Sequence, residues 1–78
     1  MQSVKISLNS IDKVKSFVNT ISQFDCDFDL LSGRYVIDAK SIMGIFSLDL
    51  AHPIELRIHS EDSEFFNDIL EALNPYLV

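Results

Sequence analysis

The hydrophobic period of this chain changes repeatedly along its length, and that change constrains the fold more than any other feature. Residues 3–9 alternate between apolar and polar side chains, with Val4 and Ile6 on one face, which predicts a half-buried strand. In residues 10–22 the apolar side chains recur at helical spacing, and Ser10 precedes them as a candidate N-cap. A half-buried strand that leads into an amphipathic helix indicates a sheet with helices packed against it.

The rest of the chain repeats this switch between the two periods. The predicted elements are a strand over residues 24–31, a turn over 32–34, a strand over 34–38, a short helix from about Ser41, a strand over 53–59 and a final helix that Pro75 ends. Either Ser60 or Ser63 is expected to cap the final helix. The β-α-β-β-α-β-α order predicts a single α+β domain over residues 1–78. We expect an open-faced β-sandwich, in which a four-stranded antiparallel sheet carries three helices on one face.

The strand over residues 24–31 has two contrasting faces. Phe24, Cys26, Phe28 and Leu30 lie on one face, and Asp25, Asp27 and Asp29 lie on the other. A calcium site needs a loop that wraps oxygen ligands around the ion, so this flat row of aspartates is expected to be a solvated face. The side chains expected in the core are Val4, Ile6, Val18, Phe24, Phe28, Leu56, Ile58, Ile69 and Leu73.

Composition narrows the classes of function. The 78 residues are 47% hydrophobic and include only 2 Gly and 2 Pro, which is typical of a globular domain. Twelve acidic residues against six basic ones give a net charge of −6, so direct binding to nucleic acid is not expected and basic protein surfaces are favoured. The apolar runs are too short to enter a membrane, and the alternating N-terminus is no signal peptide. A single cysteine, Cys26, adds to the expectation of a cytoplasmic protein.

The residue types that commonly carry catalysis do not form a recognisable set. His52 and His59 lack metal-ligand spacing with each other and with Cys26, so both histidines are expected to be ordinary surface residues. Cys26 is expected to behave as a small buried hydrophobic residue. The sequence contains no Gly-rich phosphate loop, Ser/His/Asp set or CxxC pair. We therefore expect a protein that is not an enzyme and that needs no cofactor and no metal.

The short helix near Ser41 offers the one feature with a functional interpretation. Ser41 is predicted to be the N-cap of this helix. A phosphoryl group on Ser41 is compatible with the same position, because free N–H groups and the helix dipole favour an anion there, and Lys40 is adjacent. Ile45 and Leu48 are better placed for the core than their apolar neighbours. Some of Ile42, Met43 and Phe46 are therefore expected to be exposed, as a docking surface.

Several segments resemble one known family at consistent spacing. "VIDAKSIMGIFSLDL" is similar to the segment around the regulatory serine of HPr, the histidine-containing phosphocarrier of the bacterial sugar phosphotransferase system. The "KSIMG" followed by "SL" resembles HPr of low-GC Gram-positive bacteria. "SFVNTISQF" resembles the first helix of the family, "LLSGRYV" its hairpin, and "ELRIHSED" its last strand and the entry to its last helix. The resemblance covers nearly the whole chain and implies the HPr fold.

The resemblance implies a role for Ser41. In the HPr family a dedicated kinase phosphorylates the regulatory serine, and the modified protein then binds a catabolite-control transcription factor. The match places that serine at Ser41. The adjoining residues Lys40, Ile42, Met43 and Phe46 would then contact the HPr kinase, the transcription factor or other phosphotransferase-system proteins.

The segment that holds the phosphocarrier histidine in the family differs in this chain. The family shows a "GxHxRPA"-like motif before its first helix, whereas this chain has "LNSIDKVKS". Counting back from Phe17 places Ser10 at the histidine position and Asp12 at the arginine position, and the loop before Asp12, around Asn9, is shorter. A serine phosphate is a stable ester that is unsuited to relay, and an aspartate repels the phosphoryl group.

The resemblance therefore implies an HPr-like regulatory or interaction protein that does not transfer phosphate. Two alternatives remain open at this point. One is a genuine phosphocarrier with divergent chemistry. The other is a binding module that uses the HPr fold for an unrelated partner, in which Ser41 is only a helix cap.

Overall fold

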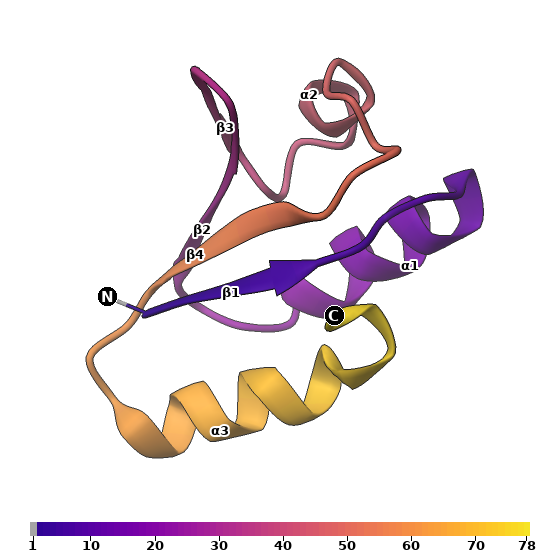
Figure 1. Ribbon diagram of the computed structural model, residues 1–78. Coiled ribbons are helices and arrows are strands. Elements are labelled where there is room, and N and C mark those ends of the chain that lie inside the picture. The colour runs from indigo at the N-terminus through magenta and orange to yellow at the C-terminus, as the bar shows by residue number, and fades with distance from the viewer. Residues whose placement is uncertain (1) are drawn as a thin grey trace.

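The chain folds into the alternating elements that its periodicity predicts. A computed structural model describes residues 2–78, apart from the side chain of Ser63. In chain order the elements are β1 (Gln2–Ile6), α1 (Ile11–Ile21), β2 (Asp27–Ser32), β3 (Tyr35–Asp38), α2 (Ile42–Phe46), β4 (Ile54–His59), α3 (Ser63–Ala72) and a 3-10 turn, η1 (Asn74–Tyr76) (Figure 1). The predicted β-α-β-β-α-β-α order is confirmed.

The strands form one antiparallel sheet in the order β1-β4-β2-β3. The late strand β4 therefore lies between β1 and β2. Phe28 pairs with Ile58 and Leu30 pairs with Leu56 across β2 and β4. Phe28 is 1% exposed, whereas its neighbour Asp27 is exposed. Because a one-residue slip would exchange the two faces, the predicted register of β2 is confirmed.

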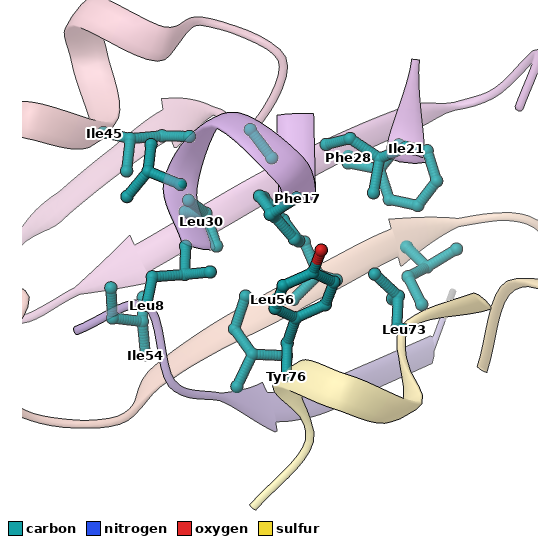
Figure 2. Close-up of a cluster of buried hydrophobic side chains, with 14 of the residues drawn as sticks. Leu8, Phe17, Ile21, Phe28, Leu30, Ile45, Ile54, Leu56, Leu73 and Tyr76 are labelled. Atoms are coloured by element: carbon teal, nitrogen blue, oxygen red, sulfur yellow. The ribbon is translucent and has the colours of Figure 1, made fainter. Parts of the chain in front are cut away.

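All three α-helices cover the same face of the sheet. Figure 1 shows α3 running below β1, and α2 packs against α1 and β3. Helices and strands contribute to one hydrophobic cluster, in which the rings of Phe17 and Tyr76 meet edge to face with centroids 5.7 Å apart (Figure 2). The predicted core residues Val4, Val18 and Phe24 are only partly buried, because they pack against the outside of this cluster.

The start of β2 differs from the sequence prediction. The strand begins at Asp27 rather than at Phe24, because local bonds hold the preceding backbone in a turn. The Phe24 N–H donates to the Ile21 carbonyl at 3.1 Å, and the Phe24 carbonyl accepts from the Lys40 ammonium at 3.0 Å. Asp25 therefore lies outside the sheet, and the expected row of three aspartates is shortened to Asp27 and Asp29.

Both ends of α3 differ from the sequence prediction. The helix ends at Ala72 rather than at Pro75, which lies within η1. Asp62 caps the helix, and its Oδ1 accepts the backbone N–H groups of Glu64 and Phe65 at 3.0 and 3.2 Å. Ser60 instead accepts the Asp62 N–H, and the Ser63 side chain lies outside the described residues. The chain after α3 turns back to β1, where a bridge between Ile6 and Leu77 covers part of the open edge of β1.

The β2–β3 hairpin turns through Gly33 and Arg34, between the paired residues Ser32 and Tyr35. Gly33 has φ of 60°, the conformation that such a two-residue turn requires of its first residue and that glycine adopts without strain. Within residues 2–78, no helix is long and apolar enough to cross a membrane.

Candidate functional site

Ser41 caps α2 as the sequence predicts. Its backbone is extended, and its Oγ accepts a hydrogen bond from the Gly44 backbone N–H at 3.3 Å. The Ser41 carbonyl accepts the Ile45 N–H at 3.1 Å, which closes the first turn. The Ser41 side chain is nevertheless exposed at the surface, so the cap leaves its hydroxyl accessible to another protein.

The apolar residues of α2 divide between the core and the surface. Ile45 and Leu48 are buried, as expected from their positions. Met43 is 77% exposed and Phe46 is 42% exposed, while Ile42 is half-buried against the core. A five-residue helix that exposes a methionine and a phenylalanine beside its cap has the character of a docking surface.

The exposed side of α2 continues into a groove that we call the α1–α2 groove. It has a volume of about 360 Å³ and is lined by Asn9, Ser10, Ile11, Phe46, Leu50 and Ala51. Ile11 is 62% exposed, although its spacing from Val14 predicts the buried side of α1. Ile11 is the first residue of the helix, and the buried side of α1 begins only at Val14. Ile11 and the partly buried Leu50 therefore belong to this apolar groove, although the sequence pattern indicated neither of them.

The start of α1 is occupied by helix-capping interactions. Ser10 is the N-cap, and its Oγ accepts the Lys13 backbone N–H at 3.1 Å. Asp12 lies in the first turn, where the helix dipole favours a carboxylate. Both residues therefore have structural roles at the position where the resemblance would place phosphocarrier chemistry.

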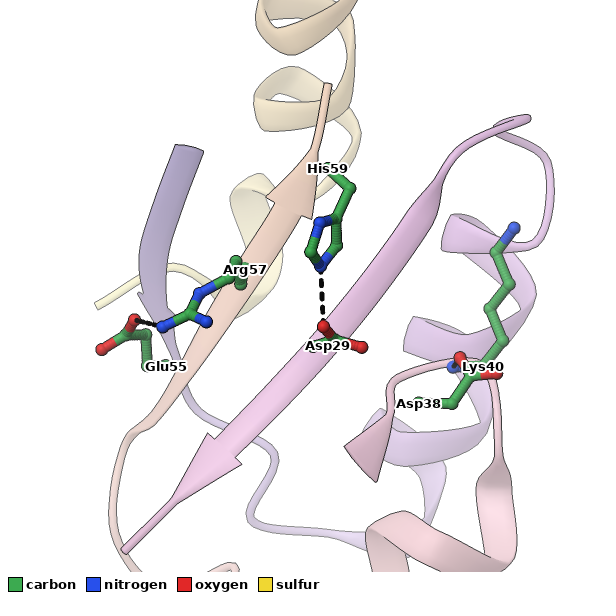
Figure 3. A network of polar contacts seen from close by, with 6 residues as sticks. All are labelled: Asp29, Asp38, Lys40, Glu55, Arg57 and His59. Atoms are coloured by element: carbon green, nitrogen blue, oxygen red, sulfur yellow. Dashed lines mark hydrogen bonds and ion pairs between the residues drawn. The ribbon is translucent and has the colours of Figure 1, made fainter. Parts of the chain in front are cut away.

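The resemblance places Lys40 in the docking surface with Met43 and Phe46, but the Lys40 side chain points elsewhere. Its ammonium donates to the Phe24 carbonyl at 3.0 Å and lies 5.6 Å from the centre of the Phe28 ring. Its backbone N–H donates to Asp38 Oδ1 at 2.9 Å. Figure 3 shows the side chain extending away from the strand end that carries Asp38. The structure thus gives Lys40 the role of an anchor for the turn before β2.

Cys26 lies in that same turn and is partly buried. Burial raises the pKa of the Cys26 thiol above its ordinary value. The nearby Lys40 ammonium lowers this pKa, and the carboxylates of Asp27 and Asp25 raise it again. Cys26 is therefore a protonated thiol at neutral pH, as a small hydrophobic residue would be.

His59 lies on the open face of the sheet, opposite the helices. Its Nε2 is 2.7 Å from Asp29 Oδ2, and the two side chains line a shallow hollow with Asp27, Phe28 and Asp38 (Figure 3). Among residues 2–78, no group of three or more histidine, cysteine or acidic side chains could hold a metal ion. His59 therefore joins β4 to β2 in a cross-strand pair.

His52 lies in the loop that leads to β4. Its side chain is 79% exposed, and its Nε2 is 3.9 Å from Asp49 Oδ2. It directly follows Ala51, which lines the α1–α2 groove together with Ser10. The fold thus brings Ala51 close to the start of α1, although the two lie about 40 residues apart in the chain.

Comparison with known proteins now identifies the family. The model of the HPr component phosphorylation site of the phosphotransferase system matches residues 13–77. The chain belongs to the HPr family. The match begins after Ser10 and Asp12, so it does not extend to the two positions where the histidine and the arginine of the family motif are expected.

Two solved HPr structures are similar to this chain. Phosphocarrier protein HPr from Bacillus anthracis str. Ames is 29% identical with a TM-score of 0.73, and the match covers 99% of this chain and 94% of that chain. HPr-C-His from Thermoanaerobacter tengcongensis is 23% identical with a TM-score of 0.74, and the match covers 95% of this chain and 92% of that chain. The predicted HPr-like fold is confirmed.

Proposed function

We propose that this HPr-family chain is a regulatory form that binds protein partners and does not relay phosphoryl groups. The observation that carries the proposal is the exposure of Ser41 beside the exposed side chains of Met43 and Phe46. A kinase of the HPr kinase type would bind this surface and modify Ser41. The phosphorylated protein would then dock onto a catabolite-control transcription factor or another phosphotransferase-system protein in the cytoplasm.

The chemistry at Ser41 is a simple phosphoryl transfer. The Ser41 Oγ attacks the γ-phosphorus of ATP held by the kinase, so one P–O bond forms and the bond to the bridging oxygen of ADP breaks. The hydroxyl proton leaves to a base of the kinase. The phosphoserine adds about 1.5 to 2 negative charges. The N–H groups of the first turn of α2 offset part of that charge, so the fold is retained.

The start of α1 supports the proposal that this chain does not relay phosphoryl groups. Counting back from Phe17 places Ser10 at the histidine position, and its Oγ already accepts the Lys13 N–H. Phosphate on a serine is a stable ester, unlike the readily transferred phosphoramidate of an imidazole. Asp12 adds a negative charge where the family has an arginine, so an incoming phosphoryl group is repelled.

The test of the regulatory role is incubation with an HPr kinase and ATP, read by intact mass. The wild type is expected to gain one phosphate and Ser41→Ala none. Ser47→Ala is the matched control, because Ser47 is an exposed serine at the other end of α2, and it is expected to be modified like the wild type. Modification of Ser41→Ala, or no modification of the wild type by a kinase active on its own HPr, would contradict the proposal.

The position of His52 favours a second candidate function, a divergent phosphocarrier. An imidazole is a group that accepts a phosphoryl group through nitrogen, and the His52 side chain is 79% exposed, with Nε2 3.9 Å from Asp49 Oδ2. Ala51, the residue before His52, lines the same groove as Ser10, which stands at the histidine position of the family motif by the count from Phe17. The acidic neighbours Asp49 and Asp12 oppose this role by charge, which is why we rank it second.

The second candidate is tested with phosphoenolpyruvate and Enzyme I. An acid-labile phosphoryl adduct that His52→Ala abolishes and His59→Ala retains would establish His52 as the acceptor. His59 is the matched control because it lies on the open face of the sheet, away from the helices, where its Nε2 is hydrogen-bonded to Asp29. Absence of an adduct on the wild type removes the second candidate.

A further inference from the structure

Strand β3 lies at an edge of the sheet, and its outer side is open. Among residues 2–78, β3 pairs only with β2, and Figure 1 shows the tip of the hairpin that these strands form standing clear of α1 and α3. Proteins commonly protect such an edge with lysine, proline or a bulge. The four residues of β3 include neither lysine nor proline, and their register with β2 is continuous. Instead, β3 carries the side chains of Tyr35 and Val36, which are 69% and 59% exposed.

The pairing of β3 with β2 determines which backbone groups face outward. Ser32 and Tyr35 flank the two-residue turn and face each other, so their N–H and C=O groups bond to each other. Because bonded and non-bonded pairs alternate along antiparallel strands, the N–H and C=O of Val36 point away from β2. The same alternation directs the Asp38 carbonyl off the sheet, where it accepts the Ser41 N–H at 3.0 Å. The open edge therefore presents a donor and an acceptor together at Val36.

The charge beside this edge is negative. Asp38 stands directly opposite Asp29 in the register of β3 and β2, and like charges in such positions repel each other. His59 bonds to Asp29 at 2.7 Å, but the ammonium of Lys40, close to Asp38 in the chain, donates to the Phe24 carbonyl instead. A cation placed beside Asp38 by another chain would relieve the repulsion. A second copy of this chain would increase it, because each copy has a net charge of −6.

We propose that the outer edge of β3 binds an extended, basic segment of another protein as an added antiparallel strand. The segment's residue opposite Val36 would exchange both backbone bonds with it, and an apolar side chain there would pack on Val36 and its cross-strand neighbour Leu31. The residue two positions earlier in the segment would lie opposite Asp38 on the same face, where a lysine or arginine fits. Four residues are too few for a stable dimer of this chain and suit a transient contact. This interface goes beyond the proposed regulatory function, because it needs neither Ser41 nor phosphate.

The probe is the acetylated and amidated peptide Thr-Lys-Thr-Val-Thr-Thr, in which the lysine stands two residues before the valine. Amide hydrogen exchange of the full chain is followed by NMR with and without the peptide at millimolar concentration. The Val36 N–H should exchange several-fold more slowly with the peptide, because it gains a strand partner. The N–H groups of Tyr35 and Ile37 are the internal control, because they already bond to β2 and should keep their rates.

Two changes separate strand addition from other modes of binding. A peptide with a methyl group on its valine nitrogen keeps every side chain but cannot donate to the Val36 carbonyl, so it should lose roughly tenfold in affinity. The variant Asp38→Asn keeps an oxygen that can accept the Lys40 backbone N–H and removes only the charge. It should bind the unmethylated peptide roughly two- to fivefold more weakly at low salt.

Four results would overturn the proposal. An unchanged Val36 exchange rate in the presence of the peptide means that the edge takes no added strand. Equal binding of the methylated peptide means that side chains alone attract it. Equal affinity of Asp38→Asn removes the preference for a basic segment. Sedimentation of the chain as a dimer without peptide, with the Val36 N–H protected, would make a second copy the occupant of the edge.

Discussion

The Ser41 hydroxyl accepts the backbone N–H of Gly44 at 3.3 Å, so the serine that resembles the family's regulatory residue also holds the start of α2. Ser41→Ala should therefore lower the free energy of unfolding, by about 0.5 to 1 kcal/mol, as for other N-cap serines. Ser10→Ala is the comparison, because Ser10 caps α1 through a shorter bond of 3.1 Å. Urea unfolding should show an equal or larger loss for Ser10→Ala, and no loss for Ser41→Ala would show that the cap contributes nothing.

The exposed side chains of α2 provide the second prediction. Met43→Ala and Phe46→Ala should each raise the KM of the kinase by roughly tenfold, as expected when an apolar anchor of an interface is removed. Their stability should change little, because both side chains are exposed. Val36→Ala is the matched control, because Val36 is an exposed apolar residue on the open face of the sheet. An equal effect of Val36→Ala on the KM would argue against a specific docking surface.

Phosphoserine at residue 41 makes an already acidic protein more negative and places the new charge beside apolar side chains. Binding of the phosphorylated protein to a basic partner should therefore weaken with added salt. The effect should be clear between about 0.1 M and about 1 M, where the Debye length falls from roughly 10 Å to roughly 3 Å. Titration calorimetry with the catabolite-control transcription factor measures this dependence, and an affinity that is independent of salt would contradict it.

The contact of Lys40 with the turn before β2 predicts the reactivity of Cys26. Burial raises the pKa of the Cys26 thiol, and the Lys40 ammonium opposes that rise. Lys40→Met should therefore raise the pKa further and slow alkylation of Cys26 at mildly alkaline pH. The pKa of Cys26 is higher in the folded chain than in the unfolded chain. The Cys26 thiol therefore contributes to the free energy of unfolding at pH values below the ordinary thiol pKa. This contribution is lost as the pH rises through the raised pKa of the folded state. Faster alkylation in Lys40→Met would show that Lys40 does not act at Cys26.

The sequence was sufficient where a local pattern decides the structure. The alternation of Phe28 with Asp27 predicted the buried face of β2, and the cap of α2 by Ser41 follows from the residue type and the helix that comes after it. A helix too short to bury every apolar residue that it carries predicted that some of Ile42, Met43 and Phe46 are exposed, and Met43 and Phe46 are. The HPr-like fold itself followed from segment resemblance together with the order of the periods.

The sequence was insufficient where a contact over a long distance decides the structure. Nothing near Phe24 indicates that the Lys40 ammonium binds its carbonyl and keeps it out of β2. Ile11 fits the buried side of α1 by spacing, but it is exposed because it begins the helix. The proximity of Ala51 to Ser10 depends on how the loop before β4 folds back, which no local pattern reports.

Whether this protein relays phosphoryl groups is tested on one sample of the wild type, divided into two parts. One part is incubated with phosphoenolpyruvate and Enzyme I, and the other with ATP and an HPr kinase. Intact mass is then recorded before and after acid treatment. A regulatory protein without relay chemistry should gain one acid-stable phosphate with ATP and none with phosphoenolpyruvate. A stoichiometric, acid-labile phosphate that appears with phosphoenolpyruvate would contradict this account.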